Sequence, residues 1–128
     1  MHILIVDDEP LVRALAKRSL RDHECEMAPN SDEALELQAE NHFDLVITDL
    51  RMPGMNGHEL ACALLEQQNA PQVIVISGCH NERLTQDLLA RGVQAVFQKP
   101  IEFSTFEQAV NNAVETPFLD QQAEGDSN

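Results

Sequence analysis

Short apolar runs alternate with longer amphipathic stretches along this chain. The five runs with the composition of strands are residues 3–6, 25–27, 45–47, 73–76 and 95–97. Four of them are continuously apolar, which is typical of strands covered on both faces of a parallel sheet. The second run, Cys-Glu-Met, alternates instead, so we predict that it lies at a sheet edge.

The stretches between the runs carry apolar residues at helical spacing, as Leu11 and Leu15 do in the first and Leu60 and Leu64 in the third. Crossovers of about a dozen residues are what neighbouring parallel strands require. The pattern therefore predicts an α/β fold of five strand–helix units, (βα)5. We expect a doubly wound open parallel sheet with helices on both faces, a three-layer sandwich.

Local signals mark the ends of several predicted helices. Asn30 with Glu33, and Ser104 with Glu107, have the spacing of capping boxes at helix starts. Gly92 suits the position just past a helix end, where the backbone turns left-handed.

Length and composition predict one folded domain with a short tail. The chain has 128 residues, of which 43% are hydrophobic, and this is enough to bury most of a core. Residues 116–128 are acidic and contain no basic residue, so we expect a domain at 1–115 followed by a flexible tail or the start of a linker. No stretch approaches the roughly 18 apolar residues of a membrane helix, and the N-terminus lacks a signal sequence, so we expect a cytoplasmic protein without membrane contact.

The chain is strongly acidic, with 22 acidic and 8 basic residues and a formal charge of −14. Direct binding to nucleic acid is not expected, because affinity for phosphate backbones comes mainly from Lys and Arg. A metal cation or a basic partner surface fits better. Cys25, Cys62 and Cys79 show no CxxC spacing and are interpreted as free thiols. His58 and Cys62 are four residues apart, but two ligands do not make a zinc site.

Chemically active residues follow four of the five predicted strands. Asp7 and Asp8 follow the first, Asp49 the third, Ser77 the fourth and Lys99 the fifth. Ligands of open α/β sheets bind beyond the carboxyl ends of the strands. We therefore expect these five side chains to meet at one edge of the sheet.

This set of residues predicts a metal-dependent phosphoryl acceptor. Lys99 cancels one of three carboxylate charges, and the remaining charge of about −2 with oxygen ligands favours Mg²⁺, with Mn²⁺ as the alternative. Asp49 can accept a phosphoryl group as an acyl phosphate. Lys99 would neutralise charge on that group, and the hydroxyl of Ser77 would donate a hydrogen bond to it.

Four motifs carry a resemblance to a known family. They are Ile-Val-Asp-Asp-Glu-Pro at 5–10, Asp-Leu-Arg-Met-Pro-Gly-Met-Asn-Gly at 49–57, Ser-Gly at 77–78 and Lys-Pro at 99–100. In order and spacing the chain resembles the receiver domain of bacterial two-component response regulators over roughly residues 2–115. The resemblance implies a flavodoxin-like sheet with strand order 2-1-3-4-5.

The resemblance also implies a role for each site residue. Asp49 would take a phosphoryl group from a phosphohistidine of a sensor histidine kinase or a histidine phosphotransfer protein. Asp8, Asp49 and the backbone carbonyl of Arg51 would ligate Mg²⁺, and Asp7 would hold a metal-bound water. Ser77 and Lys99 would contact the phosphoryl oxygens. Such a domain is a signalling phosphoacceptor that catalyses its own phosphotransfer and autodephosphorylation, rather than an enzyme acting on external substrates.

One position departs from the family pattern. The family often places an aromatic residue three positions before the lysine, and here that position is Val96. Phe97 should face the opposite side of its strand, toward the core. We therefore expect switching to depend on Ser77 and the loop after it. The output surface would be the fourth helix, fifth strand and fifth helix, which is also a candidate homodimer interface.

Three other functions are compatible with parts of the pattern. A phosphohydrolase with an aspartyl-phosphate intermediate usually needs an acid two residues after the nucleophile, where this chain has Arg51. A nucleotide-binding flavodoxin-like protein would need a phosphate-binding loop where Asp7 and Asp8 stand. The third alternative is an inactive receiver that only binds proteins. Whether the chain is a stand-alone receiver or part of a longer regulator stays open.

Overall fold

The computed structural model describes residues 2–7, 14, 18, 24–50, 57–78, 82–99 and 102–115. Its strands are β1 (His2–Val6), β2 (Glu24–Ala28), β3 (Leu45–Asp49), β4 (Gln72–Ser77) and β5 (Ala95–Gln98). Its helices are α2 (Ser31–Glu40), α3 (Gly57–Leu65), α4 (Glu82–Ala90) and α5 (Phe103–Glu115). Of the first predicted helix only Ala14 and Arg18 are described, and both are helical. The expected tail, 116–128, lies outside the described residues.

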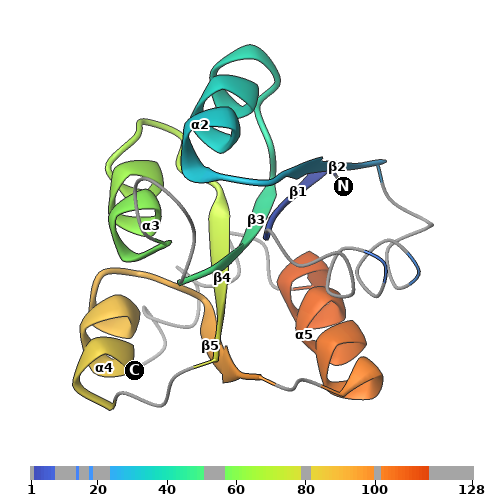
Figure 1. Ribbon diagram of the computed structural model, residues 1–128, viewed down its shortest axis with the longest axis vertical. Coiled ribbons are helices and arrows are strands. Elements are labelled where there is room, and N and C mark those ends of the chain that lie inside the picture. Colours follow the sequence, from blue (N-terminus) through green and yellow to red (C-terminus); the bar gives the residue numbers. More distant parts are fainter. Residues whose placement is uncertain are drawn as a thin grey trace.

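The five strands form one parallel sheet in the order β2-β1-β3-β4-β5, which confirms the predicted topology and the edge position of β2. Figure 1 shows α2, α3 and α4 on one side of this sheet and α5 on the other. The chain therefore has the predicted three-layer α/β architecture, in which each covered strand buries both of its faces.

Two apolar cores lie on the two faces of the sheet, and alternate residues of each strand belong to different cores. In β4, Val73 and Val75 face the helices α2, α3 and α4, whereas Ile74 and Ile76 face α5. This alternation is the two-residue period of a strand. Continuous apolar runs arise because both faces need apolar side chains.

Two of the predicted helix-end signals are confirmed. The Asn30 side chain accepts a hydrogen bond of 2.9 Å from the backbone N–H of Glu33 and caps α2. Gly92 follows α4 with φ of 109°, a left-handed conformation that glycine adopts without strain. The signal at Ser104 is wrong as a start. The helix α5 begins at Phe103, and the backbone of Phe106 already donates to the Glu102 carbonyl.

The two neighbouring residues of β5 face opposite layers, as the alternation predicts. Val96 packs against the core under α2, α3 and α4, and Phe97 packs against the core under α5. The position that is often aromatic in the resembled family is thus a partly buried valine in this chain. None of the helices in the described part of the chain is long and apolar enough to span a bilayer.

Candidate functional site

The carboxyl ends of β1 and β3 lie side by side and place two acidic residues together. Val6 pairs with Thr48 in the sheet register, so Asp7 and Asp49 are the next residues on adjacent strands. Both side chains are almost fully buried, with residue exposures of 2% and 4%. Burial of a carboxylate is costly unless a charge or hydrogen bonds compensate it. The site therefore needs a positive group.

Lys99 supplies that group. Its Nζ lies 2.9 Å from Oδ2 of Asp49 and 3.3 Å from Oδ2 of Asp7. The lysine side chain is itself only 15% exposed. Because β4 lies between β5 and β3, the lysine reaches across β4 to bridge the ends of β3 and β1. Side chains two residues apart on a strand face the same side of the sheet. The three charged residues stand two positions after residues that face α5, so their side chains lie on that side too: Asp7 after Ile5, Asp49 after Ile47 and Lys99 after Phe97.

Ser77 ends β4 at the same edge and holds the backbone of the lysine. Its carbonyl accepts a hydrogen bond of 2.7 Å from the backbone N–H of Lys99, and the residue is only 3% exposed. Ser77 pairs with Gln98 in the register of β4 and β5. The serine thus determines where the lysine leaves the sheet.

The backbone of Asp49 is held from two sides. The hydroxyl of Thr48 donates a hydrogen bond of 2.9 Å to the Asp49 carbonyl. On the other side, a Cβ on Gly57 would lie 2.0 Å from that carbonyl oxygen and 2.6 Å from Cα of Leu50. The N–H of Gly57 donates to the Leu50 carbonyl at 2.9 Å. Only glycine lets the start of α3 approach the end of β3 this closely.

Sequence reasoning missed these two supporting residues. It included Gly57 only as the last residue of the motif at 49–57, and the structure gives this glycine a close backbone contact in the first turn of α3. A glycine that ends the loop after a candidate nucleophile is the signal that could have indicated such a contact. Nothing in the sequence distinguishes Thr48 from any other strand threonine.

The structure therefore brings three of the predicted site residues into direct contact, Asp7, Asp49 and Lys99, and places Ser77 at the same sheet edge. Their chemical roles remain predictions. Asp8 and Arg51, the other expected metal ligands, lie outside the described residues. Within the described part of the chain, no group of three or more His, Cys, Asp or Glu residues could hold a metal ion.

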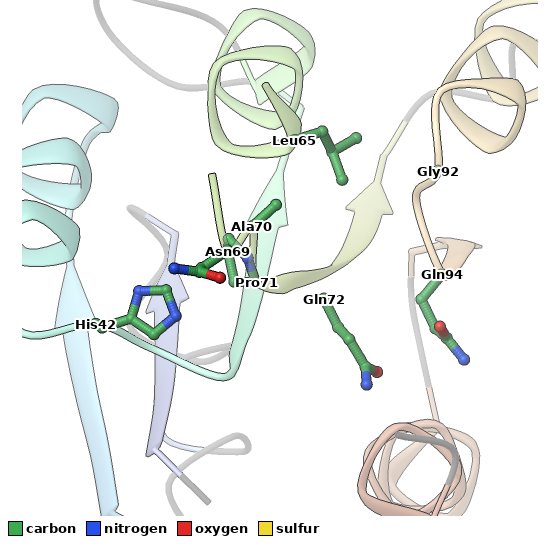
Figure 2. Close-up of a pocket in the computed structure, with 8 residues that line it drawn as sticks. All are labelled: His42, Leu65, Asn69, Ala70, Pro71, Gln72, Gly92 and Gln94. Carbon is green, nitrogen blue, oxygen red and sulfur yellow. The ribbon is translucent and has the colours of Figure 1, made fainter. Parts of the chain in front are cut away.

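A separate pocket lies at the opposite ends of the strands. Its volume is about 610 Å³, and Figure 2 shows its lining, which comes from segments at the starts of β4 and β5 and from the chain around them. The lining residues are His42, Leu65, Asn69, Ala70, Pro71, Gln72, Gly92 and Gln94. Gln72 begins β4, whereas Ser77 ends it, so this pocket is separate from the acidic edge.

The chain is thus an open α/β protein with strand order 2-1-3-4-5. Buried carboxylates and an ammonium group lie at the carboxyl edge of its sheet, where ligands of such sheets bind. Residues 3–111 match the model of the family described as the response regulator receiver domain. The match spans most of the sequence, and the chain therefore belongs to this family. Members of the family are phosphoacceptor domains in two-component signalling.

Individual relatives agree with this membership. The chain is 35% identical over 116 residues to the transcriptional regulatory protein MalR of Bacillus subtilis, covering 88% of this chain and 49% of MalR. It is 33% identical over 116 residues to the sensor histidine kinase TmoS of Ectopseudomonas mendocina, covering 88% of this chain and 12% of TmoS. The chain thus spans about half the length of MalR and a much smaller share of TmoS.

A solved receiver domain has the same fold. The crystal structure of a response regulator receiver domain protein from Clostridium thermocellum superposes with a TM-score of 0.80 at 27% sequence identity. The superposition covers 89% of this chain and 94% of that one.

Proposed function

We propose that Asp49 accepts a phosphoryl group from a phosphohistidine and that the resulting acyl phosphate switches a protein-binding surface. The observation that carries this proposal is the contact of the Lys99 ammonium with the buried carboxylates of Asp49 and Asp7. The contact of 2.9 Å with the Lys99 ammonium holds the Asp49 carboxylate in a fixed position, as a nucleophile requires.

The reaction is a group transfer between two side chains. A carboxylate oxygen of Asp49 forms a bond to phosphorus while the bond from phosphorus to the donor's imidazole nitrogen breaks, and the imidazole leaves with that electron pair. The transition state needs positioning and charge neutralisation more than covalent help. Lys99 supplies a positive charge within reach of the incoming oxygens. The Ser77 hydroxyl is the proposed donor of a further hydrogen bond to them.

The residues present fit a magnesium ion. Asp7 and Asp49 offer hard carboxylate oxygens, and with Lys99 they carry a net charge of about −1 before Asp8 is added. Asp7, Asp8, Asp49 and the carbonyl of Arg51 are the proposed holders of Mg²⁺, and Mn²⁺ is the alternative. When bound, the ion would neutralise charge on the phosphoryl oxygens.

The proposed donor is a sensor histidine kinase or a histidine phosphotransfer protein in the cytoplasm. The similarity to part of TmoS, a protein named as a sensor histidine kinase, supports a place in such a pathway. We further propose that residues 1–115 form the receiver unit, which catalyses its own phosphotransfer and autodephosphorylation. The α4-β5-α5 surface is the proposed output and candidate dimer interface, without direct nucleic-acid binding.

Phosphorylation by a small donor tests the acceptor assignment. The protein is incubated with Mg²⁺ and acetyl phosphate, and the intact mass is measured. The parent should gain one phosphoryl group that hydroxylamine removes, as expected of an acyl phosphate. The Asp49→Asn variant should gain none. Asp32→Asn is the matched control, because Asp32 is an exposed residue in the first turn of α2, and it should label as the parent does.

Equal labelling of the parent and Asp49→Asn would reject Asp49 as the acceptor. An inactive receiver would label in neither protein. Sustained hydrolysis of p-nitrophenyl phosphate would favour the phosphohydrolase alternative, whereas a phosphoacceptor should show no such turnover.

A further inference from the structure

Three polar side chains connect the first turn of α3 to the last turn of α4. His58 Nε2 lies 2.8 Å from Asp87 Oδ2, and Arg91 Nε donates to the same oxygen at 2.9 Å. A carboxylate only accepts, so the His58 Nε2 carries the proton in this contact. One oxygen of Asp87 therefore receives hydrogen bonds from His58 of α3 and from Arg91, the residue that follows α4.

The position of this cluster connects two parts of the fold that border the acidic edge. His58 follows Gly57, whose backbone lies against Asp49 and Leu50. The helix α4, which carries Asp87, follows β4 and Ser77 along the chain. A contact between α3 and α4 therefore limits how these two helices can move relative to each other.

We propose that His58, Asp87 and Arg91 form a proton-sensitive latch, in which protonation of His58 tightens the attachment of α4 to α3 and deprotonation loosens it. This regulatory role is independent of phosphoryl transfer to Asp49.

Histidine is the side-chain type that in general changes charge near neutral pH. The hydrogen bond from His58, and then that from Arg91, lowers the pKa of Asp87 below the usual value of an aspartate. The same contact with Asp87 raises the pKa of Arg91. Asp87 and Arg91 therefore both stay charged between about pH 5 and pH 8, the range in which histidine titrates.

Several charged and titratable groups lie around the cluster. Glu59 follows His58 in the first turn of α3, and Arg83 precedes Asp87 by about one turn of α4. Cys62 on α3 and Glu66 just after it act on the Arg91 charge. Val46, Val73 and Val75 belong to the core that α3 shares with α2 and α4, and Gln38 of α2 donates a hydrogen bond to Gln67, which follows α3.

All three side chains contact water, so the expected effect is modest. The side-chain exposures of His58, Asp87 and Arg91 are 29%, 43% and 50%. Exposed ion pairs change local equilibria by about two- to fivefold. This size is measurable by amide hydrogen exchange, which reports local opening of single helices.

The test is hydrogen exchange of the α4 amides, Glu82–Ala90, at about pH 5.5 and pH 8, near the two ends of the range in which histidine side chains in general change charge. Rates are divided by the intrinsic chemical rates at each pH, and the α5 amides serve as the internal reference. In the parent, α4 protection relative to α5 should be about two- to fivefold greater at the acidic pH. In His58→Gln, which keeps an N–H donor but does not titrate, this difference should vanish.

Two further variants show whether the pH response depends on the contact between His58 and Asp87. Asp87→Asn removes the charge that attracts the protonated histidine and should also abolish the pH response. His42→Gln removes an exposed histidine that lies outside the cluster, and it should retain the response. Equal α4 protection at both pH values in the parent, or an unchanged response in His58→Gln, would overturn the latch.

Discussion

Lys99 is the residue on which the charge balance of the site depends. Its ammonium lies between two carboxylates that are at most 4% exposed. Removal of one partner from a buried ion pair typically costs about 3–5 kcal/mol, because it leaves an uncompensated charge. Lys99→Met should therefore lower the free energy of unfolding by an amount in this range, as measured by urea denaturation.

A second substitution tests the cause of that loss. If repulsion between carboxylates is responsible, Asp49→Asn in the Lys99→Met background should restore part of the stability, and the double-mutant cycle should give a coupling above about 0.5 kcal/mol. Strictly additive effects would show that the lysine does not act on Asp49.

Gly57 is the second residue for which the structure predicts the effect of a substitution. A Cβ at this position would lie 2.0 Å from the Asp49 carbonyl oxygen, a backbone atom that cannot rotate away. Gly57→Ala should lower the free energy of unfolding by about 1–3 kcal/mol, the usual cost of overpacking, and should slow labelling by acetyl phosphate. Gly78→Ala is the matched control, because a Cβ there has nothing within 4 Å, and it should change stability by less than about 0.5 kcal/mol.

Among the helices, α2 allows a test of the contribution that its N-terminal cap makes to stability. The Asn30 side chain satisfies the N–H of Glu33 in the first turn. Asn30→Ala should lower the free energy of unfolding by about 1 kcal/mol. Asn41 at the other end of α2 uses its backbone N–H, which bonds to the Leu37 carbonyl. Asn41→Ala keeps that bond and should have a smaller effect in the same urea titration.

The hydrogen bonds of Asp87 on α4 predict that the free energy of unfolding depends on pH. The folded-state pKa of Asp87 is lowered by the hydrogen bonds from His58 and Arg91. A group with a lowered folded-state pKa stabilises the fold above its unfolded pKa and loses this contribution as the pH falls through the folded-state value. The stability difference between the parent and Asp87→Asn should therefore be present at neutral pH and shrink below about pH 4, near the unfolded pKa of a carboxyl group. A difference that persists in strong acid would contradict this origin.

For the whole molecule, the formal charge of −14 and the acidic edge predict a specific response to magnesium. A ligand that binds only the folded state stabilises it by about 2.7 kcal/mol at a hundredfold excess over its dissociation constant. Mg²⁺ should raise the urea midpoint more than NaCl of equal ionic strength, which only screens charge repulsion. The excess should be lost in Asp49→Asn. Equal effects of the two salts would argue against a metal site.

Much of this fold could be predicted from the sequence because its signals are periodic. The two-residue alternation and the continuous apolar runs indicated the sheet, and chemically matched residues after the strands indicated the edge where Asp7, Asp49 and Lys99 meet. The resemblance to receiver domains supplied the strand order. These features depend on local patterns and on the general topology of parallel sheets.

Other features could not be predicted because they depend on distances between elements. The tight approach of Gly57 to Asp49 and the contact of His58 with Asp87 require the helices to be placed first. The start of α5 was misjudged because Ser104 matched a capping pattern, whereas the helix already begins at Phe103. A short polar motif is compatible with several positions in the first turn.

The reach of Lys99 across β4 has a consequence for biosynthesis. The acidic edge takes its carboxylates from residues 7 and 49 and its cation from residue 99, which follows the last strand. A growing polypeptide of which only the first three strands have left the ribosome would carry the two carboxylates without their counter-ion. The proposed phosphoryl acceptance by Asp49 should therefore arise only when the final strand docks, so incomplete products of translation should not take part in signalling.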